Sequence, residues 1–249
     1  MRSVKLLAAI VLLVGSATLA SAAVTDRVTR TVGLRAGEPI RIDATIADLT
    51  ITGSNRPDVE IEIVRRAPSS ADLAKYPALI ETGADGLHIS AVQAEDGRDA
   101  QLKSQIAIRA PANAVFQSVR VFEGKITLSN LTRASDVDLR RGPIEATALA
   151  GRIRLESGIG SVDVRESELT PGGMMRLRVF NGPLRVRFAR PPQSARILAL
   201  TFNGAITSDI PLTKKDKFGP RFGETTIGDG DPVLNMDVVK GDITIRIAK

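Results

Sequence analysis

The sequence predicts an all-β fold, a β-solenoid resembling a parallel β-helix, in which short strands repeat with glycine at the corners. One phrase, apolar-x-apolar-x-x-Gly-x-apolar-x-apolar, recurs at residues 119–128, 177–186 and 236–245, and less regularly at 198–206. The turn glycines of these and shorter copies recur every 18 to 22 residues, at Gly124, Gly142, Gly160, Gly182 and Gly204. A period of this length suits one coil of a solenoid, because each coil stacks its strands on the next. We expect these glycines to occupy equivalent corners of successive coils, where positive φ favours glycine.

The turn residues leave a second interpretation open. Asn181-Gly182 and Asn203-Gly204 are favoured two-residue turns of β-hairpins. The repeats could therefore also pair as hairpins in an antiparallel β-sandwich. Local sequence does not separate a hairpin turn from a solenoid corner, but the even spacing of the glycines favours the solenoid.

The first 22 residues have the three parts of a signal peptide. Two basic residues precede a short apolar core at 6–14, and Ala20-Ser21-Ala22 is a small-x-small cleavage site. The core is shorter than the roughly 20 residues that span a bilayer. We therefore expect an exported protein, periplasmic or associated with the cell envelope, that does not span the membrane after signal cleavage. Residues 23–249 are predicted to form a single β-strand-repeat domain, and the chain has no cysteine for disulfides.

Period-two alternation of apolar and polar residues predicts the individual strands. These strands are expected at 39–44, 48–53, 59–64 and 105–109, then almost without interruption to 210, with a closing pair that ends at 247. Between them we expect one helical turn within 68–78, capped by Ser70 and ended by Pro77, and loops at 93–103 and 213–223. The side chains expected to face the interior are Ile126, Leu128, Ile153, Leu155, Leu184, Val186, Ile243 and Ile245.

The repeats resemble a family of bacterial envelope β-strand-repeat proteins of unknown function, often labelled "putative adhesin". The motifs that carry the resemblance are Glu123-Gly-Lys-Ile-Thr-Leu128, Ser157-Gly-Ile-Gly-Ser-Val-Asp-Val164 and Lys240-Gly-Asp-Ile-Thr-Ile245. This chain departs from the family pattern where Lys, Pro, Arg or Ala replaces the turn aspartate. The resemblance covers nearly all of residues 23–249. It implies an all-β, solenoid-like fold at the envelope, and it supplies no catalytic residues.

The residues that carry common enzyme chemistry are sparse. His88 is the only histidine, it is expected on the solvent face of a strand, and no Gly-x-Ser-x-Gly nucleophile motif occurs. The acidic pairs Asp136/Asp138 and Asp229/Asp231 lack the six to eight oxygen ligands of calcium, so we interpret them as turn residues. We expect no cofactor, no metal site and no catalytic residue. The alternative is a polysaccharide lyase-like enzyme on a β-solenoid, which a cleft lined by arginine or lysine and carboxylates would favour.

Arginine is concentrated in residues 174–200, which contain no acidic residue. The six arginines of this stretch, the candidate anion-binding residues, are Arg176, Arg178, Arg185, Arg187, Arg190 and Arg196. The first four alternate with apolar residues on strands, so they should point outward and gather into one basic face. The guanidinium group binds phosphate and carboxylate well. We therefore expect a non-enzymatic, adhesin-like or scaffold module. Its partner would be an anionic envelope lipid or polysaccharide, or another envelope protein. Nucleic acid is not expected, because only 3% of the residues are aromatic.

Overall fold

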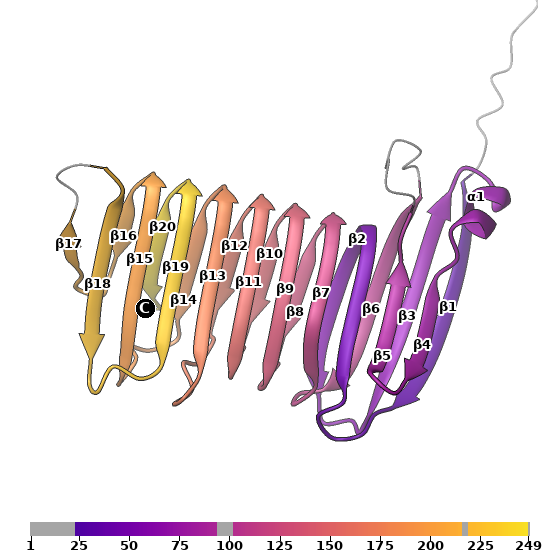
Figure 1. Ribbon diagram of the computed structural model, residues 1–249, viewed down its shortest axis with the longest axis horizontal. Helices are drawn as coiled ribbons and strands as arrows, with labels where there is room; N and C mark the ends of the chain where they lie inside the picture. The colour runs from indigo at the N-terminus through magenta and orange to yellow at the C-terminus, as the bar shows by residue number, and fades with distance from the viewer. Residues whose placement is uncertain (1–22, 94–101, 216–218, 249) are drawn as a thin grey trace, which may run out of the picture.

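The computed structural model describes residues 23–93, 102–215 and 219–248, which form twenty strands and one short helix. The all-β class is confirmed. The predicted signal peptide, residues 1–22, lies outside the described residues. Figure 1 shows two layers of strands, one behind the other, extended along the long axis of the molecule.

The first layer, here called sheet A, contains ten strands in hydrogen-bonded order. They are β1 (Val24–Gly33), β3 (Asp58–Ala67), β6 (Lys103–Pro111), the second half of β2 (Pro39–Ser54), β8 (Ile126–Ser129), β10 (Ile144–Thr147), β12 (Val162–Arg165), β14 (Leu184–Phe188), β20 (Ile243–Ile247) and β16 (Ile206–Ser208). The second layer, sheet B, shares β2. Its order is β4 (Leu79–Gly83), β5 (Gly86–Ala91), the first half of β2, β7 (Val115–Glu123), β9 (Ala134–Arg141), β11 (Arg152–Ile159), β13 (Met174–Asn181), β19 (Val233–Lys240), β15 (Ala195–Asn203), β18 (Arg221–Ile227) and β17 (Thr213–Lys215).

Neighbouring strands in the middle of both layers run parallel. Strands from β2 to β16 in sheet A, and from β5 to β15 in sheet B, pair in this way. Successive strands of the chain, such as β13 and β14, belong to different sheets, so Asn181-Gly182 joins the two layers and is not the turn of an antiparallel pair. Antiparallel pairs occur towards the two ends, where β1, β3 and β6 pair at one end and β15, β18 and β17 at the other.

The corner glycines stack on one another, as expected, but in a different order. A Cβ added to Gly142 would lie 1.7 Å from the carbonyl oxygen of Gly124, and Gly160 and Gly182 meet the preceding glycine in the same way. The next corner after Gly182 belongs to Gly241, and Gly204 then packs on Gly241. The last unit of the chain, β19 and β20, is therefore inserted between the two units before it.

The hydrophobic core fills the space between the two sheets. All eight side chains expected to face the interior are at most 2% exposed, which confirms the assignment of strand faces.

The structure corrects three local predictions. Helix α1 (Ser70–Lys75) is capped by Ser69, whose hydroxyl accepts a hydrogen bond from the Asp72 amide at 3.2 Å. Lys103 already belongs to β6. The expected loop at 213–223 includes β17 and the start of β18, and its residues 216–218, like 94–101 of the other expected loop, lie outside the described residues.

Candidate functional site

The structure does not gather the six candidate arginines on one face. Arg176 and Arg178 lie on β13 and Arg196 on β15, all on the outer face of sheet B. Arg185 and Arg187 lie on β14, on the outer face of sheet A. Arg190 follows β14 and lines a hollow of about 350 Å³ beside the proline pair 191–192. The prediction of a single basic face is therefore wrong, because the corner at Gly182 carries the chain from one layer to the other.

The arginines on sheet B have acidic neighbours from other strands. Arg178 lies beside Glu156 on one side, with the closest charged atoms 3.9 Å apart, and beside Asp237 on the other. Arg154 binds Asp136 at 3.1 Å and Glu156 at 2.9 Å. Residues 174–200 contain no acid, but acidic side chains from other strands lie beside their arginines, because strand neighbours come from residues about 20 or more positions away.

The two acidic residues of β9 are strand residues, not turn residues as predicted from the sequence. Asp136 holds Arg154, and partial burial raises the pKa of Asp138, an effect that the nearby charge of Glu156 reinforces. The other pair, Asp229 and Asp231, does lie in a turn, between β18 and β19. Within residues 23–93, 102–215 and 219–248, no three His, Cys, Asp or Glu side chains are grouped as a metal site requires.

Sheet A carries the densest row of arginines. Arg165, Arg187 and Arg246 occupy the same register position on the consecutive strands β12, β14 and β20. Adjacent strands are about 4.8 Å apart, so the three side chains start within about 10 Å of one another. Arg185 lies on the same outer face, two residues before Arg187 on β14, and its register neighbours are Asp163 and Thr244. We call these four residues the arginine row.

The ends of the arginine row are neutralised and its centre is not. Arg165 donates two hydrogen bonds to Asp163, at 3.0 and 2.9 Å, and this pairing raises the pKa of Arg165. Arg246 binds Asp209 at 2.6 Å. The guanidinium groups of Arg185 and Arg187 form no hydrogen bond or ion pair with another described residue, and both side chains are exposed. Two free cations therefore lie between two paired ones.

Sequence reasoning missed Arg165 and Arg246, although the repeat contains the signal that would have found them. Each arginine of the register position lies five residues after a corner glycine: Arg165 after Gly160, Arg187 after Gly182, and Arg246 after Gly241. Aligning the repeats at their glycines would have placed Arg165 beside Arg187, whereas Arg246 joins them only because Gly241 packs on Gly182. Counting charges along a continuous stretch selected residues that lie on both layers instead.

His88 lies in the largest of the hollows described here, near the N-terminal end of sheet B. As expected, it is on the outer face, with 45% of its side chain exposed, and its Nε2 atom is 3.0 Å from Oδ2 of Asp43. The hollow measures about 790 Å³ and is lined by the charged side chains Arg30, Arg41, Asp43, Glu81 and Asp85 in addition to His88. Both arginines are engaged, since Arg41 donates to the carbonyl of Asp85 at 2.9 Å and Arg30 to that of Ile80.

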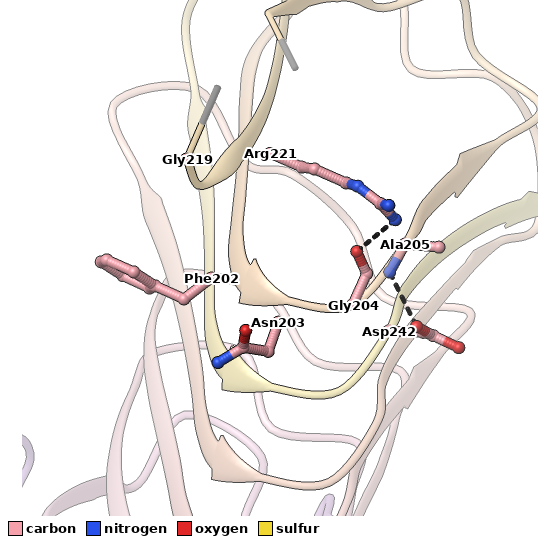
Figure 2. A pocket seen from close by; sticks show the side chains of 7 residues that line it. All are labelled: Phe202, Asn203, Gly204, Ala205, Gly219, Arg221 and Asp242. Atoms are coloured by element: carbon pink, nitrogen blue, oxygen red, sulfur yellow. Dashed lines mark hydrogen bonds between the residues drawn. The ribbon is translucent and has the colours of Figure 1, made fainter. Parts of the chain in front are cut away.

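A smaller hollow, of about 470 Å³, lies at the end of the glycine stack (Figure 2). Arg221 donates to the carbonyl oxygen of Gly204 at 2.5 Å, and the Ala205 amide donates to Asp242 at 2.7 Å. Figure 2 shows the ring of Phe202 extending away from Arg221 and Gly204. Arg221 thus covers the carbonyl on which the glycine of a further coil would otherwise pack.

No family model matches the chain, and no curated protein matches it in sequence. No helix in the described part of the chain is both long and apolar enough to cross a bilayer. Among solved structures, the chain aligns with a putative cell adhesion protein from Clostridium sporogenes at a TM-score of 0.50 and 12% identity, over 90% of this chain and 100% of that one. A putative adhesin from Bacteroides fragilis aligns at a TM-score of 0.33 and 14% identity, over 90% and 97% of the two chains.

A solved structure named as a putative cell adhesion protein is what the resemblance to the β-strand-repeat family predicts. At 12% identity, the likeness to the Clostridium protein concerns the architecture and not the ligand. The chain therefore shares the all-β fold of a putative cell adhesion protein along 90% of its length.

Proposed function

We propose that this protein is an exported, non-enzymatic binding module of the cell envelope, built as a β-solenoid, that holds anionic groups on its arginine row. The observation that carries the proposal is the pair of free guanidinium groups, Arg185 and Arg187, between the neutralised Arg165 and Arg246. The predicted signal peptide at residues 1–22 supports export.

The parallel register supports the solenoid. The amide of a corner glycine donates a hydrogen bond to the carbonyl oxygen of the residue that precedes the next glycine in the stack. Examples are Gly142 to Ile159 at 2.8 Å and Gly160 to Asn181 at 2.9 Å. Such a stack fixes the spacing between coils, so the arginines that project from successive coils form a regular array. A rigid array loses little conformational entropy on binding, which favours an extended ligand that repeats its charge.

The chemistry of the row suits phosphate or carboxylate. A guanidinium group presents several N–H donors in a fixed plane, and it can hold either anion through two parallel hydrogen bonds. The register neighbours of Arg187 are Arg165 and Arg246, each already paired with a carboxylate, so no acidic side chain competes with a bound anion for the Arg187 guanidinium group. A polymer with several such groups would engage Arg185 and Arg187 together and gain avidity from the second contact.

The test compares two charge-matched variants of residues 23–249. Arg185→Gln with Arg187→Gln removes two free cations from sheet A, and Arg176→Gln with Arg178→Gln removes two cations from sheet B, of which Arg178 is paired with Glu156. Binding is measured against polygalacturonate, which carries carboxylates, and polyphosphate, across a salt titration. We expect the sheet A variant to lose binding, the sheet B variant to keep it, and the affinity of the parent to fall with salt because exposed charges are screened within about 8 Å. Equal binding by the parent and the sheet A variant would overturn the proposal.

The hollow around His88 favours a second candidate function, the polysaccharide lyase-like enzyme. His88 would remove the proton next to a uronate carboxylate while the bond to the leaving sugar oxygen breaks. A water molecule would protonate that oxygen, and the sugar that lost the proton would keep a carbon–carbon double bond. Asp43 would hold the imidazole at the observed 3.0 Å, and Arg41, the register neighbour of His88, would exchange Asp85 for the substrate carboxylate. Incubation with polygalacturonate should then produce ultraviolet absorbance from the unsaturated product, and His88→Ala should remove it. No absorbance from the parent protein would reject this candidate.

A further inference from the structure

Apolar side chains are exposed along one edge of sheet B, at the position where its strands end. Phe122, Phe180 and Phe202 are 48%, 62% and 53% exposed, and Ile159 beside them is 53% exposed. Three of the seven phenylalanines of the chain therefore project into solvent at one edge. Exposed aromatic rings in such a group normally mark an interaction site, because their burial would be favourable.

The register places the three phenylalanines on one straight line. Phe122, Phe180 and Phe202 each lie two residues before a corner glycine, as Val239 does on β19. Since β13, β19 and β15 are neighbours in parallel register, Phe180, Val239 and Phe202 stand side by side. Figure 1 shows the arrowheads of β7, β9, β11, β13, β19 and β15 along the same edge. Five strand spacings of about 4.8 Å make this line about 24 Å long. We call it the phenylalanine ridge.

Basic side chains lie in and beside the ridge. Arg140 stands beside Phe122 in the register, and the guanidinium carbon of Arg141 lies 5.6 Å from the centre of the Phe122 ring. Lys240 follows Val239, and Arg221 lies at the far end next to Thr201. Neither Arg141 nor Lys240 forms an ion pair with a described residue. Each corner glycine at the end of strands β7, β9, β11, β13, β19 and β15 is preceded by two residues at this edge. Among these twelve residues, Glu123 is the one acidic residue.

We propose that the phenylalanine ridge docks on an anionic lipid surface. Aromatic rings alternating with basic side chains are typical of segments that lie in the membrane interface, where rings enter the acyl boundary and cations meet lipid phosphates. A protein partner would call for a continuous apolar centre with polar groups around it, whereas Arg140 and Gly158 separate Phe122 from Phe180 on this ridge and Lys240 follows Val239. A straight, rigid edge also fits a flat bilayer, because all of its rings reach the same depth together.

This docking surface is separate from the arginine row. The row lies on the outer face of sheet A, and the ridge runs along the edge where the strands of sheet B end. A molecule held on a membrane through the ridge would therefore keep Arg185 and Arg187 free for an anionic polymer. The two sites would let one rigid module connect a lipid surface with a polymer.

The first test uses the absence of tryptophan from the chain. Phe180→Trp and Phe202→Trp place single reporters on the ridge, and Met174→Trp places a control at the opposite end of β13, where Met174 is 41% exposed. We expect the emission of the two ridge reporters to shift to the blue with mixed phosphatidylcholine–phosphatidylglycerol vesicles, and to shift less with pure phosphatidylcholine vesicles. The Met174→Trp emission should stay unchanged. No shift at Phe180→Trp, or an equal shift in all three variants, would overturn the proposal.

The second test measures binding by vesicle co-sedimentation. Phe180→Thr with Phe202→Thr should weaken binding to the mixed vesicles about tenfold or more, because two rings lose their apolar contact. Met174→Thr with Leu79→Thr, which also removes two exposed apolar side chains, should bind as the parent does. Full binding by the double phenylalanine variant would overturn the proposal. A blue shift that grows with protein concentration in the absence of lipid would identify a second copy as the occupant and would also overturn it.

The two proposals fail separately. Arg185→Gln with Arg187→Gln should still bind mixed vesicles through the ridge, and Phe180→Thr with Phe202→Thr should still bind polygalacturonate through the arginine row. Loss of vesicle binding in the arginine variant, with the phenylalanine variant unaffected, would assign lipid binding to the arginine row and overturn the ridge.

Discussion

A methyl group on a corner glycine should destabilise the protein much more than one on a glycine with open surroundings. In Gly142→Ala, the new Cβ would lie 1.7 Å from the carbonyl oxygen of Gly124, so the two coils must separate by more than an ångström. Gly142 also has φ of +133°, a region that residues with a Cβ rarely adopt, so alanine adds backbone strain of about 1–2 kcal/mol. The separation disturbs the hydrogen bonds from Gly124 to Arg141, at 3.0 Å, and from Gly142 to Ile159, at 2.8 Å, each contributing about 1 kcal/mol. The expected total loss is about 3–4 kcal/mol.

The measurement is urea-induced unfolding followed by far-ultraviolet circular dichroism, with Gly33→Ala as the matched control. Gly33 ends β1, and a Cβ added there has no atom within 4 Å. The control variant should therefore unfold within about 0.5 kcal/mol of the parent, or be slightly more stable because alanine restricts the unfolded chain. A loss below about 1 kcal/mol for Gly142→Ala, with the control unchanged, would refute the reasoning that the glycine stack sets the distance between coils.

Three further predictions concern the core, the inserted unit and the dependence of stability on pH. Leu155→Ala in sheet B and Leu184→Ala in sheet A should each lower the free energy of unfolding by about 2–5 kcal/mol, because both side chains are fully buried; losses under about 0.5 kcal/mol would show that the strand faces are wrongly assigned. Gly241→Ala should destabilise the protein about as much as Gly142→Ala, since its Cβ would lie 2.0 Å from the Gly182 oxygen; a neutral effect in urea unfolding would argue against the insertion of β19 and β20. Asp138 has a pKa raised above 3.8, so the folded state binds its proton more tightly than the unfolded state does, and its contribution to stability falls as the pH rises through the raised value. Asp138→Asn should therefore gain stability relative to the parent between acidic and neutral pH, and parallel pH profiles of the two proteins would contradict this.

The arginine row and the phenylalanine ridge both depend on which strands become neighbours. Arg187 looks equivalent to Arg178 in the sequence, because each alternates with buried apolar residues. In the structure, Arg178 lies beside Glu156 and Asp237, whereas Arg187 lies beside Arg165 and Arg246. Their different surroundings come from residues about 20 to 60 positions away.

The local sequence pattern also did not predict the order in which the corner glycines pack on one another. Gly182 and Gly204 are 22 residues apart and look successive, yet Gly241 packs between them. The physical reason is that β18 pairs antiparallel with β15 and covers the far edge of that strand, while β19 pairs with both β13 and β15. Each corner has nearly the same sequence, so the repeat itself does not say which corner packs on which.

The sequence by itself determined the all-β class, the inward and outward faces of the strands and the corner role of the glycines. These features follow from short-range physics: side chains alternate along a strand, and a crowded turn with positive φ requires a residue without Cβ. Tertiary structure alone decided which arginines share a layer, which acids neutralise them and that Phe122, Phe180 and Phe202 line one edge. Those relations arise between strands, where hydrogen bonding brings distant residues about 4.8 Å apart, and a repeated local pattern does not record which repeats become neighbours.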